Sequence, residues 1–305
     1  MSLITWKTGF EQVGKGVYAY YTDGTTMMSN CVLVEGEECA LLFDVLCTRS
    51  LTKGFLDECQ KFTQKPIRYL VISHCHGDHF LGAAAASGAT ILTHISGKES
   101  LDRDRENPPF ERLQKRQPHL DYSDAVVPIP DIYLEKDCTI DLGNRLVEIR
   151  HMGHCHTPGD LGLFIPDEKI AALADVLFAG IVPATVAGDL DCWIRVLTEL
   201  EKSEYTRFIP GHGPLCKKND LSILKSYLES VRKQAYEVEA GKLTLSDEIP
   251  SPVEQTMIDA GWRETARVLF STEKYQATLR GEIYPVDMVR ILGIEKERSE
   301  KYHKQ

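Results

Sequence analysis

The sequence lacks the features that mark membrane, secreted and fibrous proteins. It contains no run of about 18 apolar residues, so we expect no membrane-spanning helix and no membrane partner. Residues 1–7 lack the basic region, apolar core and small-residue cleavage site of a secretion signal. Neither an internal repeat nor a low-complexity tract is present. Together these absences predict a globular chain, and we expect it to be cytoplasmic.

Cysteine pairs are also lacking. The nine cysteines are an odd number, and no two of them form a Cys-x-x-Cys pair. In a chain of this length the pattern is more typical of reduced thiols than of a disulfide framework. We therefore expect free thiols, in agreement with a cytoplasmic location.

An excess of positive charge is absent as well. Lys and Arg number 35 against 45 Asp and Glu, which gives a formal net charge of −10 at pH 7. Nucleic-acid binding needs a clustered basic surface that neutralises phosphates, so we expect no nucleic-acid partner. The rest of the composition is ordinary: 43% of the 305 residues are hydrophobic and 26% are charged, which allows a sizeable core.

The stretch richest in metal-binding residue types follows a predicted strand. Residues 69–72 are apolar and predict a short buried strand, after which come His74, His76, Asp78 and His79. Sites in open α/β sheets usually lie at such strand ends. The alternative is a polar surface turn that happens to be rich in histidine. The position of the stretch directly after a buried strand disfavours this interpretation.

The spacing within this stretch suits metal binding. His74 and His76 lie two residues apart, so in an extended segment their imidazoles leave the same face and can bind one ion. Gly77 permits a sharp turn, after which Asp78 and His79 can face a second ion. Imidazoles and carboxylates suit Zn²⁺, Fe²⁺ or Mn²⁺ without any thiolate.

Other predicted strands end on the same residue types. Apolar and alternating runs predict strands over residues 16–21, 30–34, 40–44, 90–94, 139–142, 146–150, 161–166, 170–175 and 208–214. Asp44 and Asp175 end two of these runs, and His212 stands between two glycines in the last. Since strand ends at one edge of a sheet converge, these side chains can join the first motif in a single cluster.

Helical patterns separate and follow the strands. Helices are predicted over residues 49–63, 79–87, 190–202 and 221–240, with two or three more within 246–292 and a frayed end over 295–305. Residues 97–131 are charged and rich in proline and arginine, so they form either a solvated helix and loop or a lid beside the site. The change to a purely helical pattern predicts a catalytic domain over residues 1–218 and a helical C-terminal extension over 219–305.

Four motifs, in this order, resemble those of the metallo-β-lactamase superfamily. They are His74-x-His76-x-Asp78-His79, His156-Thr157-Pro158-Gly159-Asp160, Asp175 and Gly211-His212-Gly213; Asp44 after a Ser29-Asn30 pair also matches. The resemblance covers roughly residues 12–216. It implies an α/β fold, the αββα four-layer sandwich of two mixed β-sheets, with the site at one edge.

The resemblance also implies a role for each of these side chains. It places them in two metal sites joined by a bridging carboxylate: His74, His76 and His156 in one, Asp78, His79 and His212 in the other, and Asp175 between them. His156 is preferred to His151 and His154 because it directly precedes Thr-Pro-Gly. Cys75 and Cys155 alternate with histidines, so we expect both thiols to point away from the metals and pack.

A member of this superfamily with this ligand set is expected to be a binuclear metal hydrolase. Two divalent ions, Zn²⁺ in first place and Fe or Mn as alternatives, bridge a water and lower its pKa from about 15.7 toward about 7, so that a hydroxide attacks the substrate. Asp78 would be catalytic, accepting a proton from the attacking water and returning one to the leaving atom. The expected partner is a small-molecule substrate: an ester, thioester, lactone or amide.

Asp175 indicates which branch of the superfamily the sequence resembles. The β-lactamases generally carry Cys or Ser there, so the ligand set is closer to the glyoxalase II and lactonase type. A tRNA-processing-type phosphodiesterase, a di-iron redox protein and an inactive scaffold are the alternatives. The acidic net charge disfavours the phosphodiesterase. The lack of a flavodoxin module disfavours the redox protein, and the complete ligand set disfavours the inactive scaffold. The C-terminal helices either cap the pocket or pack against a second subunit in a homodimer.

Overall fold

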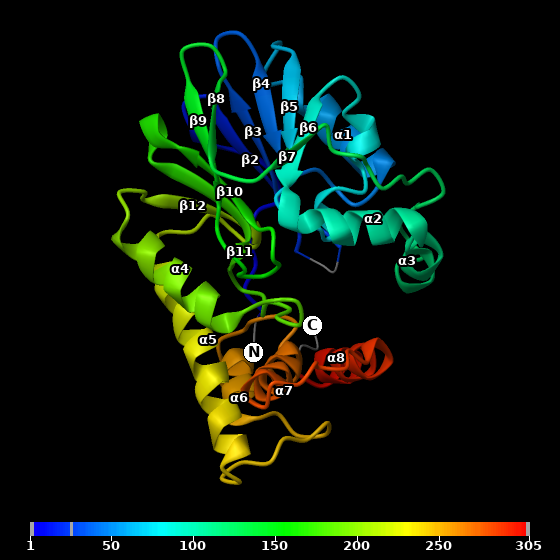
Figure 1. The fold of residues 1–305 in the computed structure, drawn as a ribbon, viewed down its shortest axis with the longest axis vertical. Coiled ribbons are helices and arrows are strands. Elements are labelled where there is room, and N and C mark those ends of the chain that lie inside the picture. Colours follow the sequence, from blue (N-terminus) through cyan, green and yellow to red (C-terminus); the bar gives the residue numbers. More distant parts are fainter. Residues whose placement is uncertain (1–2, 25–26, 303–305) are drawn as a thin grey trace.

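We describe the fold from a computed structural model of residues 3–24 and 27–302, in which two β-sheets face each other (Figure 1). Within these residues the first sheet has seven strands in sequence order: β1 (Gly9–Gly14), β2 (Val17–Tyr21), β3 (Cys31–Glu35), β4 (Ala40–Phe43), β5 (Ile67–Val71), β6 (Thr90–His94) and β7 (Ile132–Leu134). The second has the order β12-β11-β10-β9-β8: β8 (Cys138–Asp141), β9 (Leu146–His151), β10 (Leu161–Ile165), β11 (Ile170–Phe178) and β12 (Arg207–His212).

Both sheets are mixed, as the sequence predicts. Strands β1 to β4 are antiparallel and β4 to β7 are parallel. In the second sheet β8 to β11 are antiparallel, and β12 runs parallel to β11. Alternation sets the inward faces: Val17, Ala19 and Tyr21 of β2 are buried, and they share one core with Ile149 and Leu163 of the second sheet.

Helices cover the outer face of each sheet (Figure 1). Helices α1 (Arg49–Cys59), α2 (Lys98–Glu106) and α3 (Phe110–Arg116) pack with the first sheet, where Phe55 of α1 joins Leu42 and Leu70 in one buried cluster. Helices α4 (Leu190–Lys202) and α5 (Lys218–Glu239) pack with the second sheet, through a cluster that includes Trp193 and Leu228. This layering confirms the αββα sandwich.

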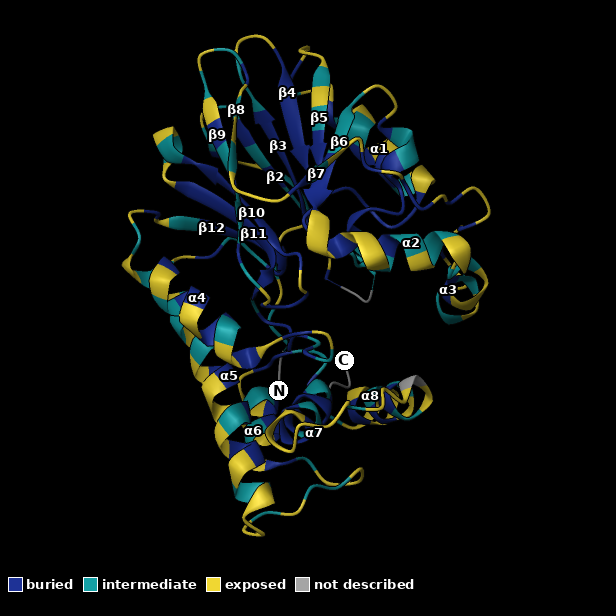
Figure 2. Ribbon diagram, in the orientation of Figure 1, coloured by how far each residue is buried: buried dark blue, intermediate teal, exposed yellow. Residues whose placement is uncertain are grey.

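Three further helices form the C-terminal part of the described chain: α6 (Pro252–Asp259), α7 (Arg267–Leu279) and α8 (Met288–Tyr302). Trp262, Val268 and Tyr275 belong to the same buried cluster as α4 and α5, and these helices lie beside α5, beyond the edge of the two sheets (Figure 2). The division at residue 218 stays a prediction. Among the described helices, none combines the length and apolar character that a bilayer crossing requires.

The structure corrects the predicted helix over residues 79–87. That segment forms two short 3₁₀ turns, η1 (Gly77–His79) and η2 (Ala83–Ala85). The backbone N–H of Gly82 donates to the carbonyl of Leu46 at 2.8 Å, and a Cβ at position 82 would collide with that same strand-following segment. This close approach fixes the segment against the chain after β4, and the alanine N–H groups make 3₁₀ bonds instead of helical ones, so the helical propensity of the alanines is overridden.

Other elements also differ from the prediction. Strand β1 had no counterpart, because its sequence, GFEQVG, has few apolar residues. Strand β11 continues past Asp175 to Phe178 instead of ending on the carboxylate. Residues 295–302 belong to α8 and are not frayed, because Glu295 Oε1 lies 3.1 Å from Nε of Arg267 and Arg298 is buried. Residues 303–305 lie outside the described part.

Candidate metal centre

The predicted ligands meet at one edge of the sheets. They come from the segment after β5, the loop between β9 and β10, strand β11 and the end of β12. Among the described residues, the side chains that could hold a metal ion form two groups: His74, His76, His156 and Asp175 in the first, and Asp78, His79 and His212 in the second. Within each group the ligand atoms lie within 4.8 Å of one another.

Asp175 joins the two groups through its two carboxylate oxygens. Its Oδ2 lies 3.1 Å from Nε2 of His156 in the first group. Its Oδ1 lies 3.2 Å from Nε2 of His79 and 3.5 Å from Nε2 of His212 in the second. Asp175 therefore lies between the two groups, at the position where the resemblance implies a bridging ligand.

An irregularity in β11 turns Asp175 toward this edge. The parallel pairing of β11 with β12 shifts register on both sides of Ala174, whose φ is 43°. A positive φ is uncommon for alanine, and register shifts of this kind redirect side chains beside functional sites. On the neighbouring strand Gly211 leaves room for the carboxylate, since a Cβ there would overlap Oδ1 of Asp175.

Buried polar groups behind the ligands fix the orientation of two imidazoles. Oδ2 of Asp44 lies 2.8 Å from Nδ1 of His79, and Ser73 Oγ lies 2.9 Å from Nδ1 of His74. Ser73 also donates to Asp44 from both its N–H and its hydroxyl, at 2.7 Å each. Because a carboxylate accepts, Nδ1 of His79 carries a proton and its other ring nitrogen, Nε2, faces the second group.

The Ser29-Asn30 pair ties two ligand-bearing segments together. The hydroxyl of Ser29 donates to the carbonyl of Asp78 at 2.6 Å. The Asn30 side-chain amide donates to the carbonyls of Pro210 and Gly213 at 3.0 and 2.9 Å, one on each side of His212. These bonds fix the positions of the segments after β5 and β12 relative to the start of β3.

Three of the ligand atoms make no hydrogen bond. Nε2 of His74, Nε2 of His79 and Oδ1 of Asp175 are buried and have no hydrogen-bond partner among the described residues. Burying such a group unpaired costs about 1–3 kcal/mol, so an arrangement that gathers several of them is unfavourable unless a ligand satisfies them. Divalent cations accept imidazole nitrogens and carboxylate oxygens together. The residues present therefore fit two divalent metal ions.

A comparison with known families agrees with this geometry. The model of the metallo-beta-lactamase superfamily matches residues 24–212, a range that contains all the side chains of both groups. The chain belongs to the metallo-β-lactamase superfamily. A curated superfamily relative, a metallo-beta-lactamase type 2 from Bacillus sp. (strain 170), is 21% identical over 224 residues, which are 70% of this chain and 79% of that protein.

Solved structures show the same superfamily fold. A metallo-beta-lactamase from Pontibacter korlensis covers 73% of this chain and 99% of its own, with a TM-score of 0.59 and 20% identity. A stereoselective inverting sec-alkylsulfatase from Pseudomonas sp. covers 92% of this chain but 52% of its own, with a TM-score of 0.68 and 15% identity. At these identities the similarity establishes the fold and leaves the substrate open.

The protonation states differ between the two groups of this superfamily member. Burial lowers the pKa of His74 well below its usual value and that of His76 to about 3, helped in both by neighbouring imidazoles. Burial opposes the charged form of His79 too, but Asp175, Asp78 and Asp44 outweigh it and raise its pKa well above the usual value. In the metal-free protein His74 and His76 of the first group are thus neutral, whereas His79 of the second favours the imidazolium form.

The other residues of the two His-rich motifs lie outside both groups. His151 stacks on His94 with ring centroids 3.7 Å apart, and Nε2 of His154 lies 2.7 Å from the carbonyl of Ala187. The thiol of Cys155 is buried and donates to the carbonyl of Met152, and Cys75 is a free thiol. His151, His154 and the thiol of Cys155 therefore serve packing and local hydrogen bonding.

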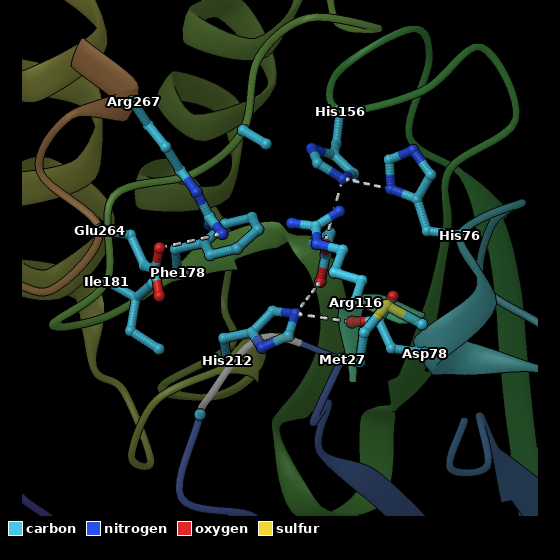
Figure 3. Close-up of a pocket in the computed structure, with 13 residues that line it drawn as sticks. Met27, His76, Asp78, Arg116, His156, Phe178, Ile181, His212, Glu264 and Arg267 are labelled. Carbon is cyan, nitrogen blue, oxygen red and sulfur yellow. Dashed lines mark hydrogen bonds and ion pairs between the residues drawn. The ribbon is translucent and has the colours of Figure 1, made fainter. Parts of the chain in front are cut away.

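A cavity of about 150 Å³ opens over the two groups. One wall consists of five candidate ligands, and the other walls carry apolar and charged side chains: Met27, Phe178, Ile181, Ala184, Arg116, Glu264 and Arg267 (Figure 3). The sequence did not single out the three charged residues of that second set. They come from α3, from the segment before α7 and from α7, and no motif marks any of them; only the high charge of residues 97–131 hinted at Arg116.

Proposed function

We propose that this chain is a binuclear metal-dependent hydrolase of a small molecule, with an ester, thioester, lactone or amide as substrate. The observation that carries the proposal is the carboxylate of Asp175, whose two oxygens face separate groups of buried ligand atoms. A single metal site would need only one of these oxygens. Two sites that share a carboxylate are typical of enzymes in which paired ions activate water and the substrate together.

The nitrogen and oxygen ligand atoms of the two groups suit Zn²⁺ best. Nitrogen and oxygen donors in a buried, rigid setting are common for Zn²⁺ and also accept Fe or Mn. When bound, the ions would supply Lewis acidity and lower the pKa of a bound water. The chain itself supplies orientation, because Asp44 and Ser73 hold the imidazoles, and such supporting hydrogen bonds typically strengthen metal binding 10- to 100-fold.

Asp78 is the proposed proton acceptor. Burial acts to raise its pKa, but His79 and His212 outweigh burial and hold the pKa well below the usual value, so the carboxylate is ionised at neutral pH. It lines the cavity, with Oδ2 3.4 Å from Nε2 of His212. An ionised carboxylate in this position can take a proton from an attacking water and return it to the leaving atom.

Metal analysis paired with a substrate panel tests this proposal. The panel contains a thioester, a homoserine lactone, a cephalosporin and a phosphodiester, together with an alkyl sulfate because an alkylsulfatase is among the similar structures. We expect about two equivalents of zinc and turnover of at least one ester-type substrate. Two equivalents of iron, with oxygen consumption and no hydrolysis, would instead favour a redox protein.

Two histidine variants make the test specific. His76→Ala removes a ligand of the first group, so we expect it to lose about one metal equivalent and at least about 100-fold in turnover. His154→Ala is the matched control, because this exposed histidine of the later motif lies outside both groups. The proposal fails if His154→Ala loses metal and turnover while His76→Ala keeps them.

A further inference from the structure

Two guanidinium groups line the cavity beside the metal-binding groups. Arg116 stands at the C-terminal end of α3, in the charged segment between β6 and β7, and Arg267 begins α7 in the C-terminal part of the chain. Figure 3 shows both side chains directed into the cavity, Arg116 in front of the histidines and Arg267 from the far side. Segments far apart in the sequence thus bring positive charge to one small space.

Arg267 is already fully engaged by its surroundings. Its Nε donates to Glu295 at 3.1 Å, its Nη1 donates to the carbonyl of Val182 at 3.0 Å, and Nη2 lies 3.5 Å from Oε2 of Glu264. These partners fix the guanidinium and offset its charge. Arg267 therefore acts as a positioning residue that ties α7 and α8 to the cavity wall.

Arg116 has no such partners. Its guanidinium makes no hydrogen bond and no ion pair within residues 3–24 and 27–302, although the side chain is only half-exposed and lines the cavity. Helix α3 is anchored by the buried Leu113, about one turn before Arg116, so the position of Arg116 does not depend on a contact of its own. A guanidinium held free at the edge of a cavity is well suited to a planar pair of anionic oxygens.

The remaining walls limit what such an anion can be attached to. Met27, Phe178 and Ile181 give the cavity an apolar side, while its volume of about 150 Å³ leaves room for only a small group. The charge of Arg267 is offset by Glu264 and Glu295. With two divalent ions bound, their charge of +4 and that of Arg116 exceed the charge of the two other carboxylates in the cavity wall, Asp78 and Asp175. Such a cavity attracts anions, and its size brings the anionic group close to the bond that reacts.

We propose, resting on the hydrolase function above, that Arg116 binds an anionic oxygen group of the substrate. The substrate class is then an ester with a short apolar part and a sulfate, phosphate or carboxylate group adjoining the bond that is broken. Arg116 is the specificity-determining residue, and residues 97–131 contribute to the site through it. Uncharged esters of the same size are poor ligands.

Binding of non-hydrolysable anions tests this assignment without any turnover. Dissociation constants of hexanesulfonate, hexylphosphonate, hexanoate and uncharged hexanol are measured by calorimetry on the metal-loaded protein and on three variants. Arg116→Ala should weaken the preferred anion about 10- to 100-fold and leave hexanol unchanged. Arg116→Lys should restore part of the loss, because an ammonium keeps the charge but not the paired geometry. The preferred anion identifies the group among the three.

Arg112→Ala is the matched control, because Arg112 lies one turn earlier on α3 and is exposed. It should bind every probe as the wild type does. Three results would overturn the proposal: no binding of any anion by the wild type, unchanged anion binding in Arg116→Ala, or equal weakening of hexanol. Arg116→Ala removes no hydrogen bond, so we expect its melting temperature to match that of the wild type, and measuring it checks that the variant is folded.

The outcome is separable from that of the hydrolase proposal. If no ester in the panel is hydrolysed but anion binding depends on Arg116, the anion site stands and the hydrolase function fails. If uncharged esters are hydrolysed and anion binding ignores Arg116, the hydrolase function stands and the anion site is overturned.

Discussion

Oδ2 of Asp44 lies 2.8 Å from Nδ1 of His79, and both side chains are shielded from solvent. Asp44 itself has a φ of 61°, a conformation that aspartate tolerates better than most residues but that still carries some strain. The carboxylate keeps the proton of His79 on Nδ1 and leaves Nε2 as the atom that faces the second group. Asp44 is thus a residue that acts on the metal centre through a ligand.

Replacing Asp44 by asparagine should weaken the second metal site selectively. The amide nitrogen can donate to Nδ1 of His79, which moves the ring proton to Nε2 and blocks that atom as a ligand. We expect metal affinity of the second group to fall about 10- to 100-fold, as measured by competition with a chelator. Asp57→Asn, on the exposed side of α1, is the control and should bind metal normally. Equal weakening of both sites would contradict this role.

Acidification should release the second ion before the first. Facing carboxylates raise the pKa of His79 above its usual value, so a metal ion must displace a proton there at any pH below that raised value. Affinity therefore falls by up to about tenfold for each unit that the pH decreases. Burial lowers the pKa of His76 to about 3, so this imidazole is already neutral at pH values above that and loses no proton when a metal ion binds.

Metal content after dialysis between pH 8 and pH 5 measures this order. We expect a step from two equivalents to one, followed by loss of the other at lower pH. In His79→Ala the first step should already be absent at pH 8, because the second group lacks a ligand. Simultaneous loss of both ions, or retention of both at pH 5, would show that His79 does not control the order.

The ligands could be predicted from the sequence because each lies next to a local signal. His74 and His76 follow an apolar strand, and His212 stands between glycines, so the pattern of a few neighbouring residues placed each at a strand end. Arg116 and Arg267 carry no such signal. They reach the cavity only because α3 and α7 pack where they do, which depends on contacts between distant parts of the chain.

The errors in the fold prediction have the same origin. The alanines of residues 83–86 favour a helix locally, but the bond from Gly82 to Leu46 fixes that segment against the chain after β4. Asp175 was expected at a strand end because it follows the apolar run of residues 170–174. The register shift around Ala174 instead lets β11 continue while the carboxylate faces the site.

Gly211→Ala should disturb the bridging carboxylate. The added methyl group would overlap Oδ1 of Asp175, so either the side chain rotates away or β11 and β12 separate. We expect loss of at least one metal equivalent and destabilisation by about 1–3 kcal/mol. Gly54→Ala, in α1 with no atom near the new methyl group, should keep both ions and stabilise the protein by about 0.5–1 kcal/mol. Normal metal content in Gly211→Ala would show that the contact is readily relieved.

Substitutions on the buried face of α5 test whether residues 1–218 and 219–305 fold separately. Leu228 is fully buried in one cluster with Trp193 of α4 and Phe208 of β12, whereas Ile223 on the same helix is 43% exposed. Leu228→Ala should therefore cost about 2–5 kcal/mol, and Ile223→Ala much less. Since the cluster is continuous, we expect one cooperative transition that shifts to lower temperature, with metal release at the same midpoint. Calorimetry that resolves two transitions, only one of them shifted by Leu228→Ala, would instead support two independently folding domains.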